Sequence, residues 1–123
     1  MAADQFAERL TMIRNRFASR LSAKIDATAA AMQILAGAGS QVIDLVVSTY
    51  HQIHELCGTA ATLGFVETGD ASREIEAVLL GPFRDRRGLT TDELASLDEG
   101  LDALRAAARI DMPLTKINSE NTP

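Results

Sequence analysis

The chain has 123 residues, of which 46% are apolar and 24% are charged, so it is long enough for one domain with a single hydrophobic core. Its formal net charge is −5 and its densest basic run, RDRR at residues 84–87, is short, so we expect no contact with nucleic acid. Aromatic residues make up 4%, and alanine and leucine dominate, which favours helices over a β-sandwich or a β-barrel.

The first predicted helix covers about residues 4–36. Its apolar residues fall at spacings of three and four, so they share one face: Phe6, Leu10, Ile13, Phe17, Leu21 and Ile25. A break near Ser22 stays open as an alternative. The segment GAGS ends the helix, with Gly37 suited to a left-handed cap.

Three further helices are predicted. The second begins at Ser40 as its N-cap and ends near residue 65, where Gly64 is well placed to stop it. The third covers about residues 69–80, between a Thr68 cap and a stop at Gly81 and Pro82. The fourth starts with the capping-box pair Thr90 and Glu93 and carries a seam of leucines.

These elements predict an all-α fold, an antiparallel up-and-down four-helix bundle with a long N-terminal helix. The bundle domain spans residues 1–110, and residues 111–123 lack apolar periodicity and are expected to form a flexible tail. Cys57 is the one cysteine, which fits a reducing compartment. Residues 1–10 do not resemble a secretory signal and no apolar run is long enough to span a membrane, so we expect a cytoplasmic protein that does not contact membranes.

The second helix presents three faces when its residues are placed at about 100° intervals. One face is a broad apolar stripe for the core, and another is polar and exposed. Between them a row of side chains repeats every three or four residues: Ile43, Val47, Tyr50, His54, Gly58 and Ala61. We call this row the His54 ridge. Its side chains shrink to Gly58 and Ala61 just beyond the histidine, which predicts an imidazole with free space beside it.

The stretch HELCGTAATLGFVETGDASREIE, residues 54–76, resembles the signature of histidine-containing phosphotransfer (HPt) domains. The matching positions are His54, Leu56, Gly58, Thr59, Ala60, Leu63, Gly64, Phe65, Ile75 and Glu76. The order of helices around this motif agrees as well, so the resemblance covers residues 1 to about 110. Many family members carry lysine three residues after the histidine, where this chain has Cys57, and often an apolar residue at the position of Thr68.

The resemblance implies a phosphorelay role. His54 would accept a phosphoryl group from the aspartyl phosphate of a receiver domain and pass it to another receiver, in a response regulator or a hybrid histidine kinase. The docking and access surface would comprise Gly58, Cys57, Ala61, Tyr50 and Val47. The chain would be a monomeric carrier rather than an enzyme, with no cofactor of its own, because Mg²⁺ and the acidic pocket belong to the receiver. The replacement of lysine by Cys57 would weaken transfer or alter the choice of partner.

Other functions stay open. His51 and His54 are three residues apart and could suggest a metal site, but their rings diverge and no further ligand is evident. As a rival phosphoacceptor, His51 has Glu55 where His54 has Gly58. The chain could also be an HPt-like adaptor that binds a receiver or kinase without accepting phosphate, or the dimeric helical hairpin of a histidine kinase. No glycine-rich phosphate loop follows a strand pattern, so ATP binding is not expected.

Overall fold

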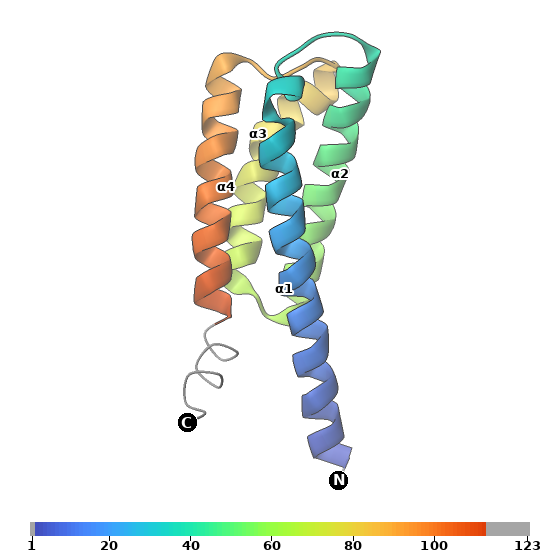
Figure 1. The fold of residues 1–123 in the computed structure, drawn as a ribbon, viewed down its shortest axis with the longest axis vertical. Coiled ribbons are helices and arrows are strands. Elements are labelled where there is room, and N and C mark those ends of the chain that lie inside the picture. The colour runs from blue at the N-terminus through green and yellow to red at the C-terminus, as the bar shows by residue number, and fades with distance from the viewer. Residues whose placement is uncertain (1, 113–123) are drawn as a thin grey trace.

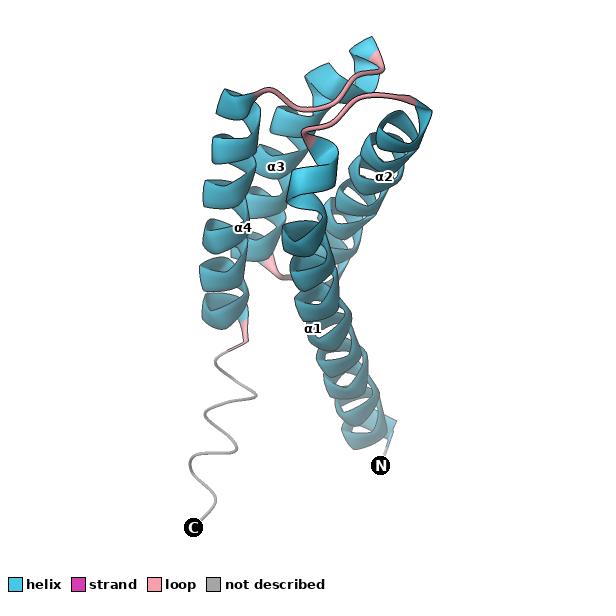
Figure 2. Cartoon of the chain, turned by 45° about the horizontal axis from the view of Figure 1, so that its top comes forward, coloured by secondary structure: helices cyan, strands magenta, loops and turns pink. Residues whose placement is uncertain are grey.

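Residues 2–112 are described in the computed structural model, and they form four helices. The helices are α1 (Ala2–Leu35), α2 (Ser40–Leu63), α3 (Val66–Asp85) and α4 (Thr91–Asp111). Successive helices run in opposite directions, so the architecture is the predicted all-α, up-and-down four-helix bundle (Figures 1 and 2). Of the segment expected to be a flexible tail, residues 113–123 lie outside the described residues.

The core lies along the axis where the apolar faces of the four helices meet. α3 packs most extensively, against α2 on one side and α4 on the other, while α1 closes the bundle between α2 and α4. The most deeply buried side chains are large and aliphatic or aromatic, and they come from all four helices: Leu21, Leu35, Val46, Ile53, Phe65, Ile75, Leu79, Leu97 and Leu104. Removing each of these leucine, isoleucine or phenylalanine side chains from water stabilises the fold by roughly 1.5–3 kcal/mol.

The N-terminal end of α1 extends past the bundle. Phe6 is 69% exposed and Ile13 is 48% exposed, although both continue the apolar face that buries Phe17. At 1.5 Å per residue, a helix of 34 residues is longer than its neighbours of 20 to 24 residues, so within residues 2–112 its first turns extend beyond the ends of the other helices (Figure 1). The predicted apolar face is real, but only its C-terminal part reaches the core. The helix has no break at Ser22.

The turn between α2 and α3 is short because Gly64 adopts a left-handed conformation, with φ 78° and ψ 20°. Its N–H donates to the carbonyl of Ala61 at 3.2 Å, and the N–H of Phe65 donates to Ala60 at 2.8 Å, the two hydrogen bonds of a Schellman motif. Phe65 then packs edge-on against Phe17 of α1, with ring centroids 5.2 Å apart. The predicted stop at Gly64 is confirmed, and the turn anchors α1 to the start of α3.

The predicted limits of the third helix were wrong at both ends. Thr68 is not a cap: it is buried inside α3, and its N–H donates to the Asp111 carboxylate of α4 at 2.6 Å. The helix also continues through Pro82 to Asp85, because a proline in the last turn removes only one backbone hydrogen bond. Asp111, which we assigned to the tail, ends α4 and caps the start of α3 in place of the missing local cap.

Two further predicted caps were wrong, and one was right. The left-handed glycine between α1 and α2 is Gly39, with φ 106°, rather than Gly37, and the N-cap of α2 is that glycine rather than Ser40. At the start of α4, Thr90 and Glu93 form the complete capping box that the sequence predicts. The Glu93 carboxylate also accepts two hydrogen bonds from the Arg87 guanidinium, at 2.7 and 3.0 Å, which ties the α3–α4 connection to α4.

Candidate functional site

His54 lies on the outer surface of α2, facing toward α3. Its side chain is 66% exposed, and its Nδ1 is hydrogen-bonded to the Glu76 carboxylate of α3. A carboxylate can only accept, so Nδ1 donates in this contact, and in the neutral form of the imidazole the lone pair is then on Nε2. Within residues 2–112, Nε2 makes no hydrogen bond. The histidine is therefore held through one nitrogen and free at the other.

Aromatic rings extend from the histidine toward the C-terminal end of α3. The ring of Tyr50, one turn before His54, lies nearly parallel to the imidazole, with centroids 6.3 Å apart and planes 15° apart. Tyr50 also stacks on Phe83 of α3 at 4.2 Å, which fixes its position between the two helices. His51 contacts Tyr50 and Phe83 edge-on, at 5.8 and 5.4 Å, and is exposed. Tyr50, Phe83 and His51 therefore form an aromatic cluster next to His54.

The surface beyond His54 is cleared of side chains. Gly58 is exposed, and a Cβ atom built on it would meet no neighbouring atom within 4 Å. The space beside it opens into a hollow of about 460 Å³ whose lining comes from α2 and α1: Ile13, Glu55, Gly58, Thr59, Thr62 and Leu63. Neither the backbone conformation nor the packing requires glycine here, because Gly58 lies inside a regular helix. The glycine leaves the surface of α2 open one turn beyond His54.

The remaining residues assigned to the docking surface differ in exposure. Ala61 is exposed, and Val47 and Tyr50 are half-buried, so these three flank His54 as the ridge predicts. Cys57 is only 8% exposed and contributes little to any outer surface. Burial raises the pKa of its thiol, the Glu76 carboxylate raises it further, and Arg73 of α3 lowers it. Cys57 is thus buried next to the site rather than exposed on its surface.

Sequence reasoning missed several of these neighbours. Glu76 is the last residue of the HPt-like pattern, but the sequence did not predict its hydrogen bond to His54. Neither Arg73 nor Phe83 was predicted to lie near the site. All three lie on α3, and which residues of α3 face His54 depends on the register between the two helices. The interval of 22 residues from His54 to Glu76 spans a turn whose length the sequence left uncertain by several residues. The capping pattern placed the start of α3 too late.

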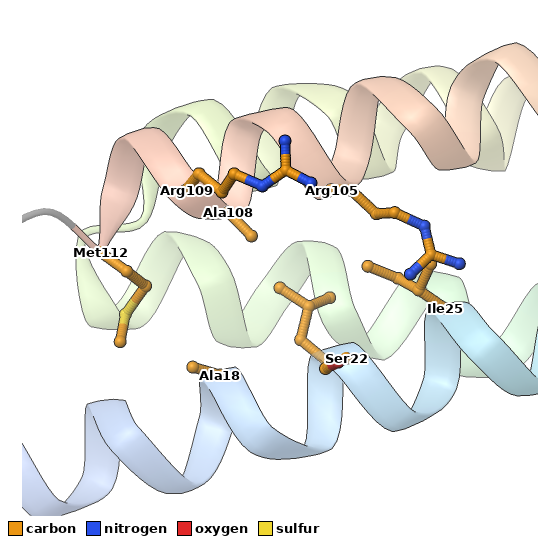
Figure 3. A pocket seen from close by; sticks show the side chains of 8 residues that line it. Ala18, Ser22, Ile25, Arg105, Ala108, Arg109 and Met112 are labelled. Carbon is orange, nitrogen blue, oxygen red and sulfur yellow. The ribbon is translucent and has the colours of Figure 1, made fainter. Parts of the chain in front are cut away.

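A second concavity lies away from this site. It is a groove of about 370 Å³ between α1 and α4, with an apolar floor and two arginines at its edge (Figure 3). Its lining residues all belong to α1 and α4 or to the residue after α4: Ala18, Leu21, Ser22, Ile25, Arg105, Ala108, Arg109 and Met112. Arg105 is already paired with Asp26 across the groove, at 2.8 Å. None of the lining residues comes from α2 or α3, so the groove is separate from His54.

Comparison with known proteins adds no assignment: no family model, curated protein or solved structure matches the chain. Among the described residues, no cluster of three or more histidine, cysteine, aspartate or glutamate side chains could hold a metal ion. Over the same residues, every helix is too short or too polar to cross a membrane. The geometry around His54 is therefore the basis from which a function can be inferred.

Proposed function

We propose that the protein is a phosphorelay intermediate of the HPt type, in which His54 carries the phosphoryl group between receiver domains. The observation that carries the proposal is the combination of a free Nε2 on an exposed imidazole with open space at Gly58. A histidine that served only the fold would need neither feature. The resemblance of residues 54–76 to the HPt signature supports the same reading.

The hydrogen bond to Glu76 prepares His54 for nucleophilic attack. With the proton held on Nδ1, the Nε2 lone pair attacks the phosphorus of an aspartyl phosphate on the receiver. The N–P bond forms while the bond between phosphorus and the aspartyl oxygen breaks, and the aspartate leaves as a carboxylate with the electron pair. The ring gains positive charge in this step, and the adjacent Glu76 carboxylate stabilises it. Transfer of the phosphoryl group from His54 to the aspartate of a second receiver reverses these changes.

Open space beside the ring serves the geometry of the reaction. Phosphoryl transfer needs the attacking nitrogen, the phosphorus and the leaving oxygen close to one line, so the active site of the receiver must approach His54 closely. A side chain at Gly58 would project into that approach, whereas glycine leaves it clear. Mg²⁺ and the acidic residues that neutralise the aspartyl phosphate would come from the receiver. The chain would supply the nucleophile and the docking surface, as a monomer in the cytoplasm.

An adaptor function is the second candidate. In that case the same surface would bind a receiver or a kinase without accepting phosphate. The presence of Cys57 at the usual lysine position favours it, because α2 then offers no cation one turn beyond His54. The free Nε2 favours the carrier, since an adaptor would gain nothing from an accessible nucleophile.

Phosphotransfer from a panel of receiver domains, each precharged at its aspartate, tests the proposal. We expect the wild type to acquire label that is stable in base and labile in acid, as phosphohistidine is, and His54→Gln to acquire none. His51→Gln is a matched control, since His51 is also exposed and lies one turn away on the same helix. It should be labelled like the wild type. Thermal melting should be nearly the same for all three proteins, because both rings are exposed.

Label that persists in His54→Gln and disappears in His51→Gln would move the acceptor to the other histidine. A wild type that binds a charged receiver but takes no label from any member of the panel would contradict the carrier and favour the adaptor.

A further inference from the structure

The register between α2 and α3 determines which residues of α3 lie beside the phosphoacceptor. The two helices are antiparallel, and His54 meets Glu76. Nearer the α2–α3 turn, Ala60 meets Gly69, where a Cβ atom on the glycine would lie 3.7 Å from the Cβ of the alanine. Between these contacts, each step toward the C-terminus of α2 corresponds to about one step toward the N-terminus of α3. The residue three after His54 is therefore level with the residue three before Glu76.

That position on α3 is occupied by Arg73. Arg73 and Glu76 are one helical turn apart, so their side chains leave α3 on neighbouring parts of one face. The residue level with Arg73 on α2 is Cys57. Three effects act on the pKa of the Cys57 thiol: burial raises it, the carboxylate of Glu76 raises it as well, and the positive charge of Arg73 lowers it. The helix register therefore places Arg73 level with the turn of α2 that follows His54, and its positive charge acts on the thiol there.

A phosphorylated His54 would need a cation nearby. The phosphoryl group carries close to two negative charges, and it would form beside the carboxylate of Glu76. Residues 50–58 of α2 and 72–80 of α3 are the turns that surround His54, and Arg73 is their one lysine or arginine. A guanidinium suits the task, because its planar N–H groups bind two phosphoryl oxygens at once.

Arg73 is free to move to such a ligand. Its present partner is Asp70, at 2.9 Å, three residues earlier on the same helix. Both side chains are more than half exposed, at 59% and 64%, and exposed pairs of this kind contribute little to stability. A charge-assisted hydrogen bond to a phosphoryl oxygen is stronger than an exposed pair in water, so the phosphoryl group would compete well for the guanidinium.

We propose that Arg73 is a phosphoryl-binding residue: its guanidinium donates hydrogen bonds to the phosphoryl oxygens as the N–P bond forms at His54 and holds them in the phosphorylated protein. This inference rests on the proposed phosphorelay function. It adds that the positive charge at the site comes from α3, across the helix interface, rather than from the turn of α2 that follows the histidine.

Transfer from a precharged receiver to four proteins, followed by rapid quench, tests the role of Arg73. The proteins are the wild type, Arg73→Gln, Arg73→Lys and the matched control Arg84→Gln. Arg84 is an exposed arginine on the last turn of the same helix. We expect Arg73→Gln to lower the maximal transfer rate at saturating receiver by about tenfold, since a hydrogen bond to a charged group is lost. Arg73→Lys should recover most of that rate, and Arg84→Gln should stay within about twofold of the wild type.

A second measurement separates phosphoryl binding from docking. Phosphorylated wild type and phosphorylated Arg73→Gln, each freed from the receiver, should differ in the ³¹P chemical shift of the phosphohistidine, because the guanidinium then contacts its oxygens in one protein only.

The outcomes distinguish the two proposals. A wild type that takes no label contradicts the phosphorelay function itself. A labelled wild type with an unchanged rate and ³¹P shift in Arg73→Gln overturns only the role of Arg73. The role of Arg73 is also overturned if Arg73→Gln only raises the receiver concentration that gives half of the maximal rate and leaves the maximal rate unchanged. Arg73 would then contact the receiver and not the phosphoryl group.

Discussion

The two faces of α2 differ in what fixes their residues. On the inner face, Val46, Ile53 and Leu56 are at most 4% exposed and fill the core against the other helices. On the His54 ridge, the histidine and Gly58 are exposed, and neither belongs to the hydrophobic core. The faces lie about a third of a turn apart on one helix, so neighbouring residues such as Ile53 and His54 have unrelated roles. Stability belongs to one face, and the proposed chemistry belongs to the other.

The glycines of the bundle show the same difference. Gly64 has φ 78°, a conformation that side chains rarely adopt, and Gly100 would place a Cβ 2.8 Å from the Cγ1 of Ile75. Both glycines are required by the fold. Gly58 has ordinary helical geometry and open space, so alanine in its place would favour the helix by about 1 kcal/mol. The proposed approach of a partner would explain why a glycine that the fold does not need lies one turn beyond an exposed imidazole.

The largest change in stability should come from the inner face. Leu56 is 4% exposed in the core, so Leu56→Ala should lower the free energy of unfolding by about 2–5 kcal/mol through lost burial and the cavity left behind. Urea denaturation followed by circular dichroism measures this change. Phosphotransfer per folded molecule should stay near the wild-type value. An unchanged midpoint would mean that Leu56 is not part of the core.

Most of the fold could be predicted from the sequence, because apolar spacing reports which faces are buried. The residues whose predicted roles were wrong show what apolar spacing cannot report. Phe6 and Ile13 continue the apolar pattern of α1 but extend past the bundle, and spacing within one helix cannot show how long its neighbours are. Thr68 resembles a cap, yet the start of α3 is capped by Asp111 from another helix, a contact between distant parts of the chain.

The candidate site could be predicted only in part, for a similar reason. His54 and Gly58 share one helix, and their spacing of four places them on one ridge in any helical register. Glu76 and Arg73 belong to α3, and their relation to His54 depends on the length of the turn at Gly64 and on how the helices align. Local patterns were thus enough to propose His54 as the nucleophile, while the charged side chains near it depend on the arrangement of two helices.

A side chain at Gly58 should separate access from stability. Gly58→Leu should lower the phosphotransfer rate by about tenfold or more, which corresponds to about 1.4 kcal/mol in the barrier, because the side chain would project into the space through which we propose that a receiver approaches. Thermal melting should show equal or higher stability, since leucine favours a helix more than glycine does. Gly58→Ala serves as the control, with a smaller loss of rate. Undiminished transfer in Gly58→Leu would contradict the access argument, and a lower melting temperature would mean that the fold requires this glycine.

The smallest effect should come from the far end of α3, where charge stabilises the fold at a distance from the site. The hydrogen bonds from Arg87, reinforced by the backbone N–H of Thr90, lower the pKa of Glu93 from 4.5 to about 2. Because the pKa is lower in the folded state, the ionised carboxylate favours folding, and this contribution is complete above about pH 4.5 and lost as the pH falls toward 2.

Glu93→Gln isolates this contribution, because glutamine can still accept the capping hydrogen bond from the N–H of Thr90. At pH 7 the variant should be less stable than the wild type by about 0.5–1 kcal/mol, the range for a partly exposed ion pair. Urea denaturation at pH 7 and at steps between pH 4.5 and 2 should show the difference shrinking as Glu93 becomes protonated. Phosphotransfer at pH 7 should be unchanged, because Glu93 belongs to the α3–α4 connection. A difference that stays constant with pH would mean that the carboxylate charge does not stabilise the fold, and a slower transfer would link this connection to the His54 ridge.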